Sequence, residues 1–250
     1  MSAAAPTPPI SALFVVRDEA VNIERAVAAV RPLVDEVVVV DTGSEDATPV
    51  LAKAAGARVV KSAWLGYGPT KNLGAGACLH DWVLSLDADE VPDAGLSAAL
   101  RGFFPEARHV YGVRRVTNYC GRWIEHGAWG RDEVWRLYDR RDVRWDERVV
   151  HENLILPEGI TRVRLAGRLL HYSYPTHADF VAKQAHYLAL SVEALRQNRR
   201  DVGWAKRYVS PWWRGFRDYV LLGGWRDGRA GWEIAKADVW MVREKYRRVR

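Results

Sequence analysis

The stretch that decides the fold is Trp82-Val83-Leu84-Ser85-Leu86-Asp87-Ala88-Asp89-Glu90. It begins as a short apolar run and ends in three acidic residues. Such a run is typical of a strand that is buried on both faces of a sheet. In an extended chain Asp87 and Asp89 would point to the same side. At the C-terminal end of a strand they would lie over the crevice where open α/β sheets bind ligands.

This pair of carboxylates indicates a metal site. Two carboxylates held close together repel each other unless a cation lies between them. A hard cation such as Mg²⁺ prefers oxygen ligands and often shares them with substrate phosphates. The alternative is that the strand ends in solvated acids with no ligand, so the rest of the chain has to decide between the two.

The residues before this stretch predict alternating strands and helices. Strands are expected at residues 10–16, 37–40 and 58–61, and helices at about 20–32, 48–55 and 70–78. This order in a short span predicts right-handed βαβ units and therefore a parallel sheet.

Three of the predicted strands end in acidic residues. Glu19 follows the first strand, Asp41 ends the second, and Asp87 and Asp89 end the fourth. A single acid there is explained as a helix cap or turn residue, but acids gathered along one sheet edge are costly without a partner. Neither a G-x-G-x-x-G fingerprint nor a P-loop follows the first strand. A nucleotide would therefore be held by carboxylates and a metal.

The second part of the chain mixes strands with an aromatic loop. A helix is expected at 92–104 and a strand at 110–117, and residues 136–138 and 143–145 are expected to form a hairpin. The loop from Gly121 to Asp132 is rich in Gly and Trp and too polar for a core. Loops of this composition commonly bind sugar hydroxyls, although a purely structural loop is the alternative.

The last segment carries the net charge. Residues 201–250 hold 12 Lys and Arg against 6 Asp and Glu. This excess of 6 positive charges equals the formal net charge of the whole chain, +6. They also hold half of the 12 Trp residues. Amphipathic helices are expected at about 179–197, after Ser210-Pro211, and at 232–246. Trp on one side and Lys or Arg on the other suit a membrane interface; the alternative is packing on the catalytic domain or on another subunit.

Length and composition limit the class of protein. The 250 residues suffice for one sizeable α/β domain with an appendage. Residues 1–9 predict a disordered lead, with neither a signal peptide nor a membrane span in the chain. Cys78 and Cys120 are the two cysteines, so neither a disulfide framework nor a zinc cluster is expected, and a reducing cytoplasmic setting fits.

Several motifs resemble one family. Val39-Val40-Asp41-Thr42-Gly43-Ser44-Glu45-Asp46-Ala47-Thr48 resembles the VVDxxSxDxT signature of family 2 glycosyltransferases, which have the GT-A fold. Arg17-Asp18-Glu19 with Asn22-Ile23 resembles the N-E-x-x-N-I opening of that family, with Asp18 in place of the usual Asn. Residues 66–72 and 84–90 are similar to the branch that adds sugars to the lipopolysaccharide core, the β-glucosyltransferase type. The resemblance runs from residue 10 to about 175 and continues more weakly beyond.

The resemblance implies an inverting transfer from a nucleotide sugar, a UDP-sugar, to a lipid-linked saccharide. It assigns nucleotide-sugar binding to Arg17, Glu19, Asp41, Lys71 and Asp87. Asp89 would be the direct ligand of Mg²⁺ or Mn²⁺, aided by Asp87. The metal would neutralise the leaving diphosphate as a Lewis acid.

The resemblance also places the acceptor site and the base. The loop that holds Trp123, His126 and Trp129 would contact the acceptor. A general base must deprotonate the attacking hydroxyl; Asp132 is the first candidate and Glu152 the second. His151, in a V-H-E motif, would be a third metal ligand or an acceptor contact, and His171 competes for that role.

The sequence thus predicts a GT-A-type α/β domain at 10–175, with a nucleotide-binding half at 10–91 and an acceptor-binding half at 92–175. Residues 176–250 would be a helical extension that associates with anionic lipid on the cytoplasmic face of the membrane. Two other classes compete. A nucleotidyltransferase would carry a Gly-rich basic loop after the first strand, where Arg17-Asp18-Glu19 stands instead. A nucleic-acid-binding module would use the basic tail, but no recognised motif accompanies that charge, so nucleic acid is not expected as a partner.

Overall fold

The computed structural model describes residues 8–147, 152–197 and 203–249. The chain forms two compact units. Unit 1 consists of residues 1–114 and 133–170, and unit 2 of residues 115–132 and 171–250. Most of the predicted disordered lead, and His151, lie outside the described residues. The division into nucleotide-binding and acceptor-binding halves is a functional one, and it stays a prediction.

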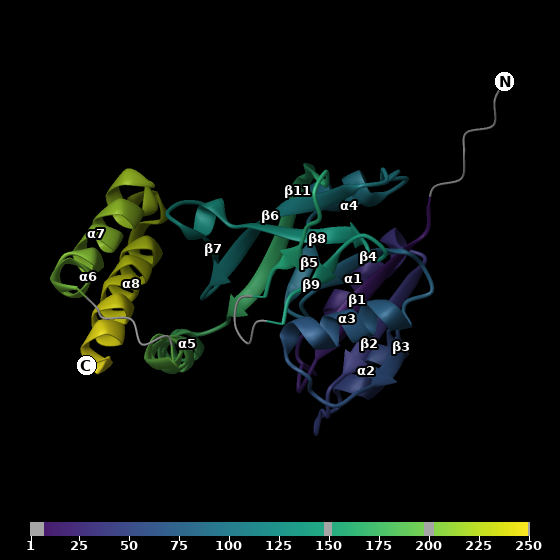
Figure 1. The fold of residues 1–250 in the computed structure, drawn as a ribbon, viewed down its shortest axis with the longest axis horizontal. Coiled ribbons are helices and arrows are strands. Elements are labelled where there is room, and N and C mark those ends of the chain that lie inside the picture. The colour runs from purple at the N-terminus through teal and green to yellow at the C-terminus, as the bar shows by residue number, and fades with distance from the viewer. Residues whose placement is uncertain (1–7, 148–151, 198–202, 250) are drawn as a thin grey trace. The chain divides into compact units, whose positions relative to one another are not determined.

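Unit 1 begins with the predicted alternation of strands and helices (Figure 1). The strands are β1 (Ile10–Val16), β2 (Glu36–Asp41), β3 (Arg58–Lys61) and β4 (Trp82–Leu86). The helices are α1 (Ile23–Val30), the 3₁₀ turn η1 (Arg31–Leu33), α2 (Thr48–Ala54) and α3 (Tyr67–Ala77). The strands are parallel in the order β3-β2-β1-β4.

Register places the ends of the central strands at one edge. Val16 of β1 pairs with Asp41 of β2, and Phe14 of β1 pairs with Leu86 of β4. These strands are buried almost throughout because they consist of apolar and β-branched residues. The acids that follow them are therefore brought to the same side of unit 1, as predicted.

The sheet continues with antiparallel strands. β8 (Glu133–Asp139) lies between β4 and β6 (His109–Tyr119) and is antiparallel to both. The order then runs through β11 (Thr161–Tyr174) to β5 (Glu90–Pro92). Helix α4 (Ala94–Leu100) begins later than predicted, because residues 90–92 form β5 and the Asp93 carboxylate caps the helix at Leu96 N, 2.7 Å away.

The predicted hairpin of 136–138 with 143–145 is wrong. β9 (Arg144–Trp145) pairs with β10 (Leu154–Ile155) in a separate two-stranded sheet. β8 cannot take β9 as a partner because both of its edges are occupied, by β4 and β6. The turn after β8 is nonetheless tight, with Val143 N donating to Asp139 O at 2.9 Å.

Unit 2 holds the C-terminal helices and the aromatic loop. Its elements are β7 (Arg122–Trp123), the 3₁₀ turns η2 (Trp129–Arg131) and η4 (Gly224–Asp227), the π-helical turn η3 (Arg217–Leu221), and helices α5 (His177–Gln197), α6 (Trp204–Tyr208), α7 (Ser210–Phe216) and α8 (Gly228–Arg248). Helix α8 packs against α5 and α7. A small core joins the loop to the helices, with Tyr119 and Ile124 packed among Phe180, Ala230 and Ile234.

The predicted fold class, a GT-A-type α/β domain followed by amphipathic C-terminal helices, is confirmed. The sheet is mixed, with a parallel block through its first four strands. Across the described ranges, each helix falls short of the length or the apolar character that a bilayer crossing requires.

Candidate active site

The loops after β1 and β2 are joined by hydrogen bonds in unit 1. Asp18 N donates to Ser44 Oγ at 3.0 Å, and Glu45 N donates to Asp18 Oδ1 at 2.8 Å. Asp18 has φ of 55°, in the left-handed region where Asn and Asp are enriched. This explains why Asp replaces the usual Asn of the family opening at little cost.

The carboxylates of these two loops also stabilise local turns. Asp41 is buried, and its Oδ1 accepts from Ser44 N at 3.0 Å. Glu19 accepts from Asn22 Nδ2 at 2.8 Å, and Arg17 is exposed, 3.7 Å from Asp18. Unit 1 therefore brings Glu19 and Asp41 to the predicted edge, where each already has a structural role.

The acidic stretch after β4 turns instead of staying extended. The strand ends at Leu86, and Glu90 N donates to Asp87 O at 3.0 Å, which closes a turn over Ala88 and Asp89. Asp87 N in turn donates to Glu90 Oε2 at 3.1 Å. The prediction that Asp87 and Asp89 share a side as neighbours on an extended strand is therefore wrong.

A buried arginine binds this turn. Arg136 Nη2 on β8 lies 2.7 Å from Asp87 Oδ2 and 2.5 Å from Glu90 Oε1. Glu90 is fully buried, and Arg136 is 5% exposed. Burial lowers the pKa of Arg136, but the two carboxylates outweigh it and raise the pKa above its usual value. Arg136 therefore stays charged and fixes the turn through both acids.

Lys71 on α3 is the second buried cation of the site. Its Nζ lies 2.7 Å from Glu152 Oε1, 3.6 Å from Asp87 Oδ1 and 4.4 Å from the ring centroid of Trp145. The Lys71 side chain is only 5% exposed. Unit 1 thus joins two residues that the sequence assigned to nucleotide-sugar binding, Lys71 and Asp87, with the second candidate for the base, Glu152.

A glycine sets the approach of the β9–β10 segment to α3. A Cβ at Gly68 would lie 1.7 Å from the carbonyl oxygen of Asp146, closer than any side chain allows. The backbone at Asp146 therefore lies directly against the start of the helix that carries Lys71.

Together these residues form what we call the strand-edge cluster, which consists of Lys71, Asp87, Glu90, Arg136 and Glu152. It holds three carboxylates and two cations within unit 1. The sequence interpretation missed Glu90 and Arg136 as members. The available signal was a charged residue inside the apolar run of β8, because a charge at such a position requires a buried partner.

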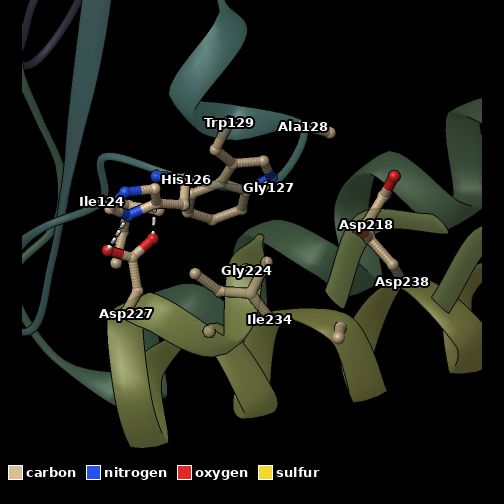
Figure 2. Close-up of a pocket in the computed structure, with 12 residues that line it drawn as sticks. Ile124, His126, Gly127, Ala128, Trp129, Asp218, Gly224, Asp227, Ile234 and Asp238 are labelled. Carbon is tan, nitrogen blue, oxygen red and sulfur yellow. Dashed lines mark hydrogen bonds and ion pairs between the residues drawn. The ribbon is translucent and has the colours of Figure 1, made fainter. Parts of the chain in front are cut away.

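Asp132 and the aromatic loop belong to unit 2. Asp132 Oδ2 accepts from Arg115 Nε at 2.7 Å. His126 is held by Asp227, which accepts from His126 N at 2.9 Å and lies 3.1 Å from its Nδ1. Figure 2 shows this pair at one end of a small pocket, with Asp218 and Asp238 at the other end. His171 Nδ1 lies 3.4 Å from Thr117 Oγ1.

The two tryptophans of the predicted acceptor site pack against other rings of unit 2. Trp129 stacks on Tyr174 with centroids 5.4 Å apart, and Trp123 meets Tyr172 edge-on at 5.1 Å. Both stay partly exposed. Each ring therefore has a structural role and a face that a sugar could contact; acceptor binding stays a prediction.

The residues at the strand edge fit a metal of the magnesium type. Within the described ranges, no group of three or more His, Cys, Asp or Glu side chains is placed to hold a metal by itself. Mg²⁺ is commonly held by one or two carboxylates together with substrate phosphates, so a complete protein cage is not required. Asp89 is partly exposed beside Asp87, which suits such a shared site.

Relatives of the chain are glycosyltransferases. An uncharacterized glycosyltransferase of Rickettsia bellii is 45% identical over 84 residues, which cover 34% of this chain and 29% of the relative. The lipopolysaccharide core biosynthesis glycosyltransferase LpsC of Rhizobium meliloti is 26% identical over 234 residues, 90% of this chain and 86% of that protein. The chain thus spans less than a third of the Rickettsia bellii protein and most of the Rhizobium protein.

A solved structure and a family model also match. Glucosyl-3-phosphoglycerate synthase from Mycobacterium tuberculosis, in complex with Mn²⁺, UDP and glucosyl-3-phosphoglycerate, is 27% identical over 44% of this chain and 44% of that chain, with a TM-score of 0.38. The model described as "Glycosyl transferase family 2" matches residues 11–154, more than half of the sequence. The match spans every member of the strand-edge cluster, and the chain belongs to glycosyl transferase family 2.

Proposed function

We propose that this glycosyltransferase moves a sugar from a UDP-sugar to a lipid-linked saccharide such as the lipopolysaccharide core, with inversion at the anomeric carbon. The observation that carries the proposal is the edge of unit 1 where β1, β2 and β4 end together, with Glu19, Asp41 and the strand-edge cluster. This edge is where open α/β sheets bind ligands.

In this proposal the donor lies along the edge. Glu19 and Asp41 contact the base and ribose, with Arg17 beside them, and Lys71 faces the diphosphate. Lys71 is held by Glu152 at 2.7 Å and by Asp87 at 3.6 Å. A diphosphate would compete with these carboxylates for the ammonium group, so donor binding would loosen the contact between Lys71 and Glu152.

The metal would be Mg²⁺ or Mn²⁺ on Asp89, with Asp87 as its neighbour. Asp87 is also bound by Arg136, and the resemblance assigns the direct ligand to Asp89. The bound ion would neutralise charge on the leaving diphosphate. His151 or His171 would be the third ligand; His151 lies outside the described residues, and His171 belongs to unit 2.

The base would be Asp132, with Glu152 as the second candidate. In an inverting transfer the carboxylate takes the proton of the acceptor hydroxyl while that oxygen forms the new glycosidic bond. The bond between the anomeric carbon and the diphosphate breaks on the opposite face. Each candidate is bound by one cation, Arg115 or Lys71, and would have to keep an oxygen available for the hydroxyl.

The acceptor assignment has two supports. The Rhizobium relative is named for lipopolysaccharide core biosynthesis and aligns with most of this chain. The partly exposed rings of Trp123 and Trp129, with His126, offer aromatic and polar contacts for a saccharide. The exposed Trp residues and the positive charge of residues 201–250 support association with the cytoplasmic face of the membrane.

A ligand screen by thermal shift tests the donor assignment. UDP-sugars, other nucleotide sugars and nucleoside triphosphates would each be added with Mg²⁺, with Mn²⁺ or with EDTA. A ligand at 100 times its Kd stabilises the folded protein by about 2.7 kcal/mol. We expect stabilisation by a UDP-sugar only when metal is present. Stabilisation by triphosphates alone would favour the nucleotidyltransferase alternative.

A further inference from the structure

An open apolar groove lies within unit 2, with α7 and η3 on one side and α8 on the other. Its volume is about 490 Å³, and five of its eleven lining residues are aromatic, with Trp212, Phe216 and Tyr219 on one side and Trp232 and Trp240 on the other. Trp212 is 63% exposed and Trp240 45% exposed. The sequence predicted an apolar face on each helix, and the two faces meet across this groove.

Helices α7 and α8 pack closely beside the groove. A Cβ at Gly215 would lie 2.4 Å from Cγ2 of Val239, so α7 approaches α8 as closely as a glycine allows. Tyr219 and Trp232 meet edge-on with centroids 5.3 Å apart. The groove lies beside these two contacts and is lined by the large rings.

The charge on the groove is positive. Lys236 and Arg243 are its two charged lining residues, and no acidic side chain lines it among the described residues. The positive charge at the end of α8 is more compensated than the sequence suggested, since Arg247 and Arg248 both bind Glu244, at 2.8 and 3.3 Å. Lys236 and Arg243 thus place two cations beside the apolar lining of the groove.

We propose that this groove binds the hydrocarbon chain of an anionic membrane lipid, with Lys236 and Arg243 facing its headgroup. The inference deepens the membrane association proposed above by naming the site of contact. The volume falls within the range of about 300–1,000 Å³ that is usual for small-molecule sites. Aromatic rings beside cations suit the boundary between headgroups and acyl chains.

A second copy of the chain fits this groove less well. A symmetric dimer across it would bring Lys236 and Arg243 of both copies together, and like charges in an interface oppose association. A membrane with anionic lipid has the complementary charge.

Two pairs of neighbouring residues provide matched tests. Val220 lines the groove and is 47% exposed, whereas Leu221 does not line it and is 55% exposed. Trp212 and Trp213 form the second pair, with exposures of 63% and 54%. Val220→Glu and Trp212→Ala change the groove, and Leu221→Glu and Trp213→Ala change a similar amount of exposed apolar surface outside it.

The experiment is flotation of the full chain with phosphatidylglycerol vesicles and with phosphatidylcholine vesicles, at about 0.1 and 0.5 M salt. We expect the unchanged chain to bind phosphatidylglycerol and to retain part of this binding at high salt, because burial of a hydrocarbon chain is not screened. Val220→Glu and Trp212→Ala should weaken binding about tenfold, and the matched controls less than about threefold. Phosphatidylglycerol with brominated acyl chains should quench Trp fluorescence less in Trp212→Ala than in Trp213→Ala.

Three results would overturn the inference. Equal losses within each matched pair would show a general surface effect, and complete release by salt would show binding by charge alone. A dimer in light scattering that Val220→Glu dissociates would show that a second copy covers the groove. Thermal shift with the donor separates this question from the proposed function, because the four variants should bind donor equally whether or not they bind lipid.

Discussion

Unit 1 and unit 2 both bury acidic side chains, but they compensate them differently. In unit 1, Arg136 binds Asp87 and Glu90 at 2.7 and 2.5 Å, and Lys71 binds Glu152 at 2.7 Å. In unit 2, Asp218 and Asp238 each have a buried Oδ2 without a hydrogen-bond partner among the described residues. Arg217 lies 2.7 Å from Asp218 Oδ1, but Arg214 comes only within 3.8 Å of Asp238.

The difference separates a site whose acids are closely paired with buried cations from a site in which one buried carboxylate, Asp238, is only weakly paired. In unit 1, Arg136 and Lys71 are paired with the acids at the edge where a diphosphate and a metal would bind. Burial in unit 2 raises the pKa of Asp238 to about 6, and the neighbouring Asp218 carboxylate adds to this effect. Breaking the buried ion pairs of unit 1 should therefore lower the stability of the protein, whereas neutralising Asp238 in unit 2 should raise it.

The largest effect is expected from Asp89 in unit 1. Asp89→Ala should abolish sugar transfer and metal-dependent donor binding, because the proposed direct metal ligand is lost. The fold should persist, since Asp89 is partly exposed in the turn that follows β4. Activity assays and thermal shift with donor and Mn²⁺ measure both effects. Retained activity with unchanged metal dependence would rule out this metal site.

The second prediction asks which unit supplies the base. Asp132→Asn should bind donor normally and turn over about 10²–10⁴ times more slowly, because a general base is lost while its shape is kept. Glu152→Gln is the matched variant in unit 1. If Asp132→Asn has a kcat close to that of the unchanged enzyme and Glu152→Gln is inactive, the assignment of the general base moves from Asp132 to Glu152.

The third prediction concerns the buried ion pairs of Arg136 in unit 1. Arg136→Leu leaves Asp87 and Glu90 without their shared cation, and removing one partner of a buried ion pair typically costs about 3–5 kcal/mol. Denaturant unfolding measures this loss. Arg164→Leu removes an exposed ion pair with Glu133, in which the two side chains are 57% and 36% exposed, and should change stability little. Similar losses of unfolding free energy in the two variants would show that the burial of Arg136 adds nothing to its contribution to stability.

The fourth prediction concerns the weakly paired carboxylate of unit 2, Asp238. The folded pKa of Asp238, about 6, lies above the usual value of 3.8, so folding favours the protonated form. This contribution to stability is present in full below about pH 4 and is lost as the pH rises through about 6. Asp238→Asn should therefore be more stable than the unchanged protein at pH 8, by up to about 3 kcal/mol.

The pH dependence distinguishes this effect from a general change in charge. The stability difference between Asp238→Asn and the unchanged protein should disappear near pH 4. Asp142→Asn, which changes an exposed carboxylate of unit 1, serves as the control. A stability difference for Asp238→Asn that does not vary between pH 4 and pH 8 would contradict the assignment.

Much of the fold could be predicted because its elements are marked locally. The strands at 10–16 and 58–61 have the predicted limits, since apolar β-branched runs between turn residues indicate buried strands. The long helix that ends at Gln197 also follows from its local pattern. β11 was missed, because its Arg-rich sequence alternates only weakly between apolar and polar residues.

The partners within the site were harder to predict than its position. Strand ends placed Glu19, Asp41 and Asp87 at one edge, because parallel register follows from the order of elements. The ion pairs of Arg136 with Asp87 and of Lys71 with Glu152 depend on which strands pair in the sheet and on which loops approach each other. These residues are 49 and 81 positions apart in the chain, so no local pattern relates them.

The way the chain passes between the units limits how the protein can be shortened. Residues 115–132 leave unit 1 and pack with the C-terminal helices, where Tyr119 donates to Glu233 at 2.8 Å and Ile124 packs with Ala230 and Ile234. A truncated chain that ends at residue 175 would keep this excursion but lose the helices that cover it. Tyr119, Ile124 and Tyr174 would then be exposed as a new apolar surface. The end of the predicted catalytic domain at residue 175 is therefore not a suitable site for truncating the chain.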